Sequence, residues 1–298
     1  GDCFHWHAGI KALDAKRESL HPAYGEDGQG ENIMAAVGQT PIAPYTVANN
    51  LTFADLRAAL AAGWRDFAAF PAFGLFFAAF YAIGGAVLVY GLVKLGEGAW
   101  SIPLIAGFPI IAPFAAVGLY EVSRRRQAGL PISWRSIIWA LRGRGDDQVL
   151  MVAGIVFVAF SFWMILAHGI FAIFMAESGI GGENIEMLLQ PLAIAMLLIG
   201  SVVGALFAFA LYAITVMSLP MLCDKDVDFI TAIIVSLGTI RSNKAVMIGW
   251  AAFISISSFL AMLPAFLGLF VVLPVLGHAT WHLYCRAVDG AALDSAGA

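Results

Sequence analysis

Long apolar runs separated by short polar connections fill the chain after residue 67. Four runs cover residues 68–92, 102–120, 149–175 and 189–216. Each is long enough for a helix that crosses the ~30 Å hydrocarbon core of a bilayer at ~1.5 Å per residue. A fifth run, 245–284, has no charged side chain and would form a helix about twice as long as that core. We therefore predict that it folds back just before Pro264, which gives six transmembrane helices.

Three amphipathic segments, 53–67, 133–145 and 228–244, each precede a pair of these runs. In the first segment the apolar stripe consists of Phe53, Leu56, Leu60 and Trp64, and the polar side of Asp55, Arg57, Arg65 and Asp66. Helices with such a pattern lie in the plane of a membrane interface. We predict three interfacial helices.

Together these segments predict an all-α integral membrane protein made of three repeats, each an interfacial helix followed by a hairpin of two spans. The predicted parts are a polar N-terminal tail (1–50), repeats at 51–122, 123–221 and 222–290, and a C-terminal tail (291–298). The first and third repeats share one proline and glycine spacing, in "PLIAGFPIIAP" (103–113) and "PAFLGLFVVLP" (264–274). The N-terminal tail has no helical periodicity, so we expect it to be flexible or loosely docked.

Lysine and arginine gather on one side of the predicted spans. They are Arg57, Arg65, Arg124, Arg125, Arg126, Arg135, Arg142, Arg144, Lys225, Arg241, Lys244 and Arg286. The opposite side has Lys94 and the acidic connection "ESGIGGENIEMLLQP". Basic residues favour the cytoplasmic side of a membrane. We predict a multi-pass membrane protein with both termini in the cytoplasm, which for a bacterial protein is a location in the inner membrane.

Composition supports the membrane class. Hydrophobic residues make up 61% of the 298 residues and charged residues 12%, about half the charged fraction of soluble domains. Cys3, Cys223 and Cys285 lie far apart, without the spacing of a disulfide framework or a structural zinc site.

The segments "GWRDFAAFPAFGLFFAAFYAIGG" (63–85) and "GHATWHLYCRAVD" (277–289) resemble a bacterial integral-membrane family catalogued as domain of unknown function 2189. The resemblance covers roughly residues 50–290. Some members of that family are labelled as cytochrome c oxidase subunits. The resemblance therefore implies an association with a respiratory oxidase.

Two histidines near the C-terminus, His278 and His282, are four residues apart and share a helix face. They are weak candidates for a metal site, together with Cys285 or with His5 and His7 of the tail. A catalytic zinc ion needs at least three protein ligands, and this run supplies no acidic one. We favour an interfacial anchor made of Trp281, His282, Tyr284 and Arg286. We predict no bound haem, metal or other cofactor.

Other residues suggest contacts with lipid or with a partner. The run Arg124, Arg125 and Arg126 would attract anionic lipid head groups. Phe70, Phe73, Phe77 and Phe80 form a stripe that could contact lipid or another subunit. The spacing of Gly200 and Gly204 is typical of close helix packing.

No charged residue lies within the predicted spans, and no motif of a known catalytic site occurs. Ion-coupled transport and enzymatic activity are therefore disfavoured. We predict a non-catalytic accessory or assembly subunit of a larger membrane complex such as a respiratory cytochrome c oxidase. Its partners would be membrane lipids and other integral-membrane subunits, with no nucleic acid. The alternative is a carrier or lipid-handling protein with a cavity between the repeats; a carrier should have a continuous polar-lined cavity near Ser255, Ser257 and Ser258.

Overall fold

The structure is a computed structural model that describes residues 45–95, 112–140, 148–175 and 191–289. All regular elements within these ranges are helices, as predicted. They are α3 (Phe53–Ala69), α4 (Pro71–Leu95), α6 (Ala112–Gln127), α7 (Trp134–Ala140), α8 (Gln148–Met175), α9 (Pro191–Thr215), α10 (Ser218–Asp224), α11 (Phe229–Ser242), α12 (Lys244–Met262), α13 (Leu269–Tyr284) and the π-helix η3 (Cys285–Asp289).

Local sequence determines where several helices begin. At the start of α3, the side chain of Thr52 accepts a hydrogen bond from the backbone N–H of Asp55, and the Asp55 carboxylate accepts one from the N–H of Thr52. This reciprocal pair satisfies donors that a helix start leaves without partners. At the start of α11, the Asp228 carboxylate accepts a hydrogen bond from the N–H of Thr231 at 3.0 Å. Pro71 stands at the first position of α4, where its missing N–H costs nothing.

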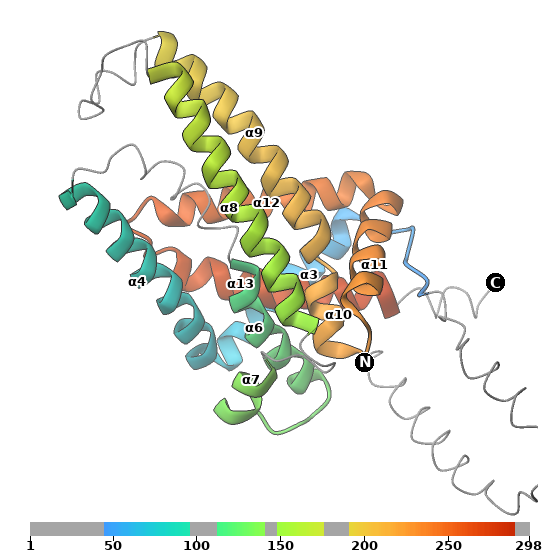
Figure 1. The fold of residues 1–298 in the computed structure, drawn as a ribbon. Coiled ribbons are helices and arrows are strands. Elements are labelled where there is room, and N and C mark those ends of the chain that lie inside the picture. The colour runs from blue at the N-terminus through green and yellow to red at the C-terminus, as the bar shows by residue number, and fades with distance from the viewer. Residues whose placement is uncertain (1–44, 96–111, 141–147, 176–190, 290–298) are drawn as a thin grey trace, which may run out of the picture.

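Helix α13 lies at the centre of one half of the molecule and packs against α3, α4, α6 and α12 (Figure 1). Its closest neighbour is α3. A Cβ atom added at Gly63 would lie 2.6 Å from the backbone nitrogen of Ala279 and 2.7 Å from the carbonyl oxygen of Val275. Only glycine allows the two backbones to approach this closely, so Gly63 sets the distance between α3 and α13.

The long apolar run at 245–284 breaks where the sequence predicted. Helix α12 ends at Met262, and the chain turns before α13 begins at Leu269. Two non-glycine residues in this turn, Ala265 and Phe266, adopt left-handed φ angles of 51° and 66°. Gly268 closes the turn against Ala261, because a Cβ at this position would lie 2.7 Å from the Ala261 backbone.

Helices α8 and α9 form an antiparallel hairpin that projects beyond the rest of the molecule (Figure 1). It is attached mainly at one end, through α10 and α11. There, the hydroxyl of Ser236 donates to the carbonyl of Ala213 at 2.7 Å and accepts from the backbone N–H of Met217 at 3.2 Å. Tyr212 also donates to the carbonyl of Met247 on α12.

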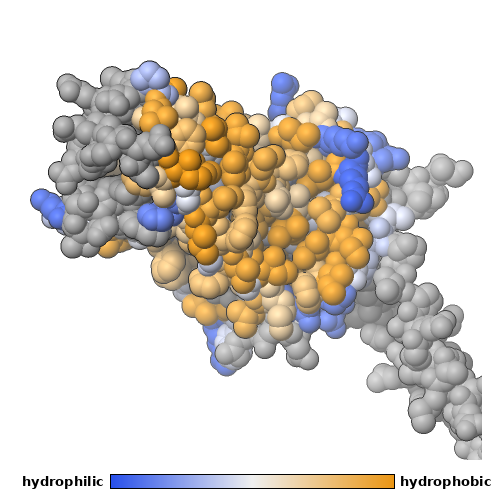
Figure 2. All heavy atoms as spheres, turned by 45° about the horizontal axis from the view of Figure 1, so that its top comes forward, coloured by the Kyte–Doolittle hydropathy of each residue, from blue (hydrophilic) through white to orange (hydrophobic). Residues whose placement is uncertain are grey.

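Four helical stretches in the described residues are long and apolar enough to cross a membrane: Pro71–Gly91, Gln148–Phe174, Pro191–Asp224 and Lys244–Met262. Their outward side chains form a broad apolar surface (Figure 2). Helices α6 and α13, predicted as the other two spans, have 16 residues each, about 24 Å of helix against a core of ~30 Å. The start of the second predicted span lies outside the described residues. The six spans, the three repeats and the cytoplasmic orientation stay predictions.

The last residues of the predicted N-terminal tail are docked on the helices. The buried side chain of Asn243, between α11 and α12, donates to the carbonyl of Ala48 at 2.6 Å and accepts from the N–H of Leu51 at 3.0 Å. The N–H of Ala48 donates to the carbonyl of Ala287 in η3 at 2.8 Å. The two ends of the described chain therefore lie side by side. The rest of that tail, with His5 and His7, lies outside the described residues.

Candidate functional site: an apolar cavity and a buried polar network

A cavity of about 1340 Å³ separates the α8–α9 hairpin from α4, α6, α12 and α13. Each of these six helices contributes to its wall, for example through Tyr81, Leu119, Trp163, Gly204, Ser255 and Thr280. The volume exceeds the ~300–1,000 Å³ that is usual for small-molecule sites. The cavity lies between the segments that the sequence assigned to the second repeat and to the other two.

The cavity wall is apolar. No charged side chain is among its lining residues in the described part of the chain. Several of its hydroxyl groups already donate to backbone carbonyls: Thr215 to Leu211, Thr280 to Leu276 and Tyr212 to Met247. The wall therefore offers packing surface to an apolar molecule and has no partner for an ionised group.

Two glycines of α9, Gly200 and Gly204, line this cavity. A Cβ added at Gly200 would meet no atom within 4 Å, and one added at Gly204 would meet the Trp163 ring of α8 at 2.9 Å. The expectation of close helix packing at this pair is therefore wrong for Gly200. Gly200 leaves room in the cavity, whereas the Trp163 ring occupies the space beside Gly204.

A buried polar network joins α3, α6 and α13. Asp66 is its centre and is 5% exposed. Its carboxylate accepts hydrogen bonds from the Ser123 hydroxyl at 2.5 Å, from Nη1 of Arg126 at 2.7 Å and from Nε2 of His282 at 2.8 Å. Gly277 and Thr280, which flank His278 on α13, line the cavity, so the network lies beside the cavity wall.

The hydrogen bonds determine the protonation pattern of the two histidines. An ionised carboxylate can only accept, so the single Ser123 hydrogen points to Asp66. Nδ1 of His278, 2.8 Å from Ser123 Oγ, must then carry the proton that it donates to this oxygen. Its Nε2 has no hydrogen-bond partner in the described structure. Trp281 donates to Oε1 of Gln127 at 2.7 Å, which turns the Gln127 amide nitrogen toward Nδ1 of His282 at 3.1 Å.

The charge on Asp66 is stabilised by these neighbours. Burial by itself would raise the pKa of this carboxyl, but the hydrogen bonds from His282 and Ser123 outweigh burial, and the pKa lies below its ordinary value. Asp66 is therefore ionised at neutral pH. The network thus carries a buried negative charge opposite Arg126.

Serine, histidine and aspartate occur together here, but they do not form a catalytic triad. In such a triad the carboxylate orients the histidine that activates the serine. Here Asp66 bonds directly to Ser123 and to His282, while Nδ1 of His278 bonds to the serine oxygen and not to the carboxylate. Ser123 and His278 are both 0% exposed, so no substrate reaches them. Among the described residues, no group of three His, Cys, Asp or Glu side chains has the geometry of a metal site.

The predicted interfacial anchor requires correction. Trp281 and Tyr284 are 0% exposed and pack inside the protein, where the Tyr284 hydroxyl donates to Asp224 at 3.0 Å. His282 binds Asp66, and Arg286 contacts Asn50 and Asp55. The sequence suggested contacts with lipid because Trp and Tyr are common at interfaces. In this chain the same residues stabilise the contacts of α13.

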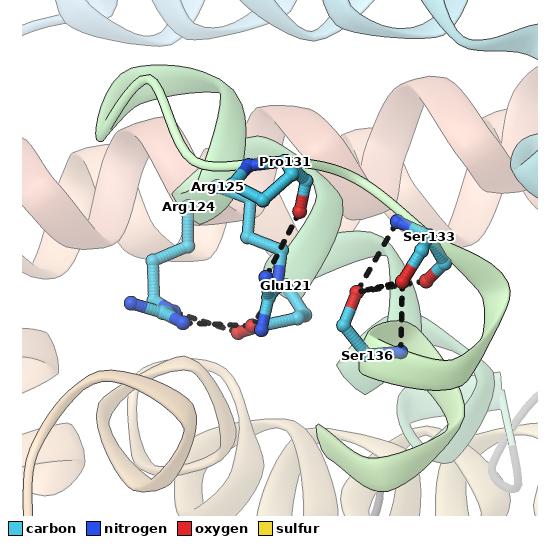
Figure 3. Close-up of polar contacts among 6 residues, drawn as sticks. All are labelled: Glu121, Arg124, Arg125, Pro131, Ser133 and Ser136. Atoms are coloured by element: carbon cyan, nitrogen blue, oxygen red, sulfur yellow. Dashed lines mark hydrogen bonds and ion pairs between the residues drawn. The ribbon is translucent and has the colours of Figure 1, made fainter.

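The predicted head-group arginines are largely paired within the protein. Arg124 and Arg125 both bind Glu121, with N–O distances of 2.6 Å, and Arg125 also donates to the carbonyl of Pro131 (Figure 3). Arg126 binds Asp66. Arg124 is only 8% exposed. Their geometry favours a role in fixing α6 over the capture of a lipid head group.

The phenylalanine stripe of α4 divides between two environments. Phe73 and Phe77 are each 8% exposed and pack with Leu119 and Ile137, whereas Phe80 is 78% exposed. Phe70 is half-buried and lies under the guanidinium group of Arg126. Only the Phe80 side of the stripe is free to contact lipid or another subunit.

Sequence reasoning missed the residues that form the network, Asp66, Ser123 and Gln127. A usable signal was present in α3: Leu56, Ala59, Gly63 and Asp66 follow one another at helical spacing and are all buried. The stripe chosen from the sequence was rotated from this one, because Trp64, which is 53% exposed, appeared more apolar than Gly63 or Ala59.

Comparison with known proteins gives one match. Residues 101–224 match the model of a family described as predicted integral membrane protein (DUF2189). The match confirms the family resemblance over this segment, and the description does not mention an oxidase. A search of curated proteins and a search of solved structures find no match.

Proposed function

We propose that this integral membrane protein takes a long apolar molecule into the cavity between the α8–α9 hairpin and the rest of the bundle. The cavity is the observation that carries the proposal: about 1340 Å³, bounded by six helices and lined without charge. This is the carrier or lipid-handling alternative of the sequence analysis. Of the three serines of that alternative, Ser255 and Ser258 line the cavity and Ser257 does not, and the wall is apolar where a polar lining was expected.

The distribution of charge supports a binding role over an ion-coupled one. Among the described residues, the buried acidic side chains Asp66 and Glu121 each have cationic partners and lie outside the cavity wall. Coupling to an ion requires a charged group that the moving ion can reach. The cavity therefore suits an uncharged ligand.

A cavity-filling variant tests the proposal. A phenylalanine at Gly200 would project into open space in the cavity, and one at Gly154, on the exposed face of α8, would project into open space outside it. The protein is purified in mild detergent, and retained small molecules are extracted and identified by mass spectrometry. We expect an apolar molecule with the wild type and with Gly154→Phe, and its loss with Gly200→Phe. Equal retention by all three, or none by the wild type, would overturn the proposal.

The accessory-subunit hypothesis has its own support and its own test. The exposed side of α4, with Phe76, Phe80, Ile83, Val87 and Tyr90, is a surface that another membrane subunit could cover. Affinity purification of the tagged chain followed by mass spectrometry would reveal stoichiometric partners. Recovery of respiratory subunits, lost when Phe80 is changed to Ser, would favour that hypothesis. Recovery of the chain alone would count against it.

A further inference from the structure

We infer that the occupant of the cavity is the acyl chain of a bilayer lipid, and that the lipid head group stays outside the bundle. This inference rests on the proposed function and specifies the chemical class of the ligand. It is argued from the surroundings of the cavity, its length and the chemistry of its wall.

The surroundings of the cavity indicate where the ligand comes from. Four of the six helices around it, α4, α8, α9 and α12, contain candidate membrane spans. Their outward side chains are apolar and strongly exposed, for example Phe157 at 70% and Leu206 at 65%. The hairpin α8–α9 is attached mainly through α10 and α11. In a bilayer, the apolar outer faces of these four helices would contact the hydrocarbon core.

The cavity is elongated along α9. Its wall on this helix extends from Met196 to Val216, with Gly200, Gly204 and Ala208 on the same helix face. This stretch corresponds to about 30 Å of helix, comparable with the ~30 Å hydrocarbon core of a bilayer. An extended acyl chain can lie along this wall, whereas a compact apolar molecule would occupy only a part of it.

The wall also excludes the head group. A phosphate inside the cavity would lose its hydration and would meet no charged partner among the lining residues. Gly200 leaves room for methylene groups on the α9 side, and the Trp163 ring lies against Gly204 in the same wall. The structure thus separates a chain-binding interior from a head group in the interface.

Trp163 provides an internal probe because it lines the cavity and is only 5% exposed. The protein is reconstituted in phosphatidylcholine vesicles whose acyl chains carry bromine at mid-chain, since bromine quenches tryptophan fluorescence on contact. The contribution of Trp163 is the difference between the wild type and Trp163→Phe. Trp250, which is 0% exposed and does not line the cavity, gives the control difference through Trp250→Phe.

We expect bromolipid to quench the Trp163 contribution and to leave that of Trp250 unchanged. Gly200→Phe should abolish the Trp163 quenching, while Gly154→Phe should not. Quenching of Trp163 that persists in Gly200→Phe would mean contact from outside the bundle and would overturn the inference. A short bromoalkane added to unlabelled vesicles separates the two proposals. If it quenches Trp163 and bromolipid does not, the inference fails and the proposed function stands; if neither quenches, both fail.

Discussion

Helices pack in opposite ways in the α3–α6–α13 region and in the α8–α9 hairpin. In the first region the backbones touch at Gly63, and buried polar groups bond to one another around Asp66. In the hairpin, a Cβ added at Gly154, Gly169 or Gly200 would meet no atom within 4 Å, most side chains are apolar, and the helices pack mainly on each other.

The difference shows which groups fix the position of one helix relative to another. A buried carboxylate with three donors is satisfied in one arrangement only, so α3, α6 and α13 have a defined position relative to one another. The hairpin carries no such restraint along most of its length. The cavity lies beside this less restrained hairpin, and α6 and α13 form part of the wall that faces it.

The largest expected effect comes from removing the buried charge. Asp66→Ala would leave Arg126, His282 and Ser123 without their common acceptor, and we expect a loss of stability of about 3–5 kcal/mol. Thermal unfolding in detergent measures it. Asp226→Ala, at an exposed position, is the control and should change little. A loss for Asp66→Ala no larger than for the control would contradict the role of the network.

The same network predicts a pH dependence. The pKa of Asp66 is lowered in the folded protein, so its stabilisation is fully present above the unfolded value of about 3.9 and is lost as the pH falls through the folded value. The difference in melting temperature between the wild type and Asp66→Asn should stay constant from about pH 8 to pH 5 and shrink below about pH 4. A difference that grows on acidification would exclude this explanation.

One substitution at two glycines compares the regions directly. Gly63→Ala places a Cβ 2.6 Å from backbone nitrogen and should destabilise the protein by about 1–3 kcal/mol. Gly154→Ala in α8 meets no atom within 4 Å and should stabilise by up to about 1 kcal/mol through helix propensity. Chemical denaturation of both variants gives the two values. Equal effects would mean that the close approach of α3 and α13 is absent.

The docked segment before α3 tests how far the rigid region extends. Asn243→Ala would leave the N–H of Leu51 and the carbonyl of Ala48 without their partner, at a cost of about 1–3 kcal/mol. Hydrogen exchange should show faster exchange of the Leu51 amide, while amides in the middle of α8 stay unchanged. Ser242→Ala, at the neighbouring exposed position, is the matched control. Protection of Leu51 that survives in Asn243→Ala would mean that other contacts hold the segment.

The smallest stability effect is expected in the cavity. Gly200→Phe adds a large side chain where a Cβ has no neighbour, so the free energy of unfolding should change by no more than about 0.5 kcal/mol. Thermal unfolding of delipidated protein measures it. A loss comparable with that of Gly63→Ala would show that the hairpin closes on the bundle.

The periodicity and the length of the apolar runs were sufficient to predict which segments form helices. They were not sufficient to predict which faces of these helices contact one another. The break before Pro264 and the start of α11 at Asp228 follow from local chemistry, and both are confirmed. The orientation of α3 was wrong because hydropathy alone gave Trp64 more weight than Gly63. A glycine contributes to packing through the approach it permits, which no hydropathy value records.

The sequence by itself determined an all-helical membrane protein, because apolar runs of this length have no other stable environment. It also determined caps and breaks, which depend on neighbouring residues. Only the tertiary structure decided that His278, Trp281 and Arg124 are buried, and that Gly200 faces a cavity. These outcomes depend on which helices meet, and residues as far apart as Asp66 and His282 share a hydrogen bond only after the chain has folded.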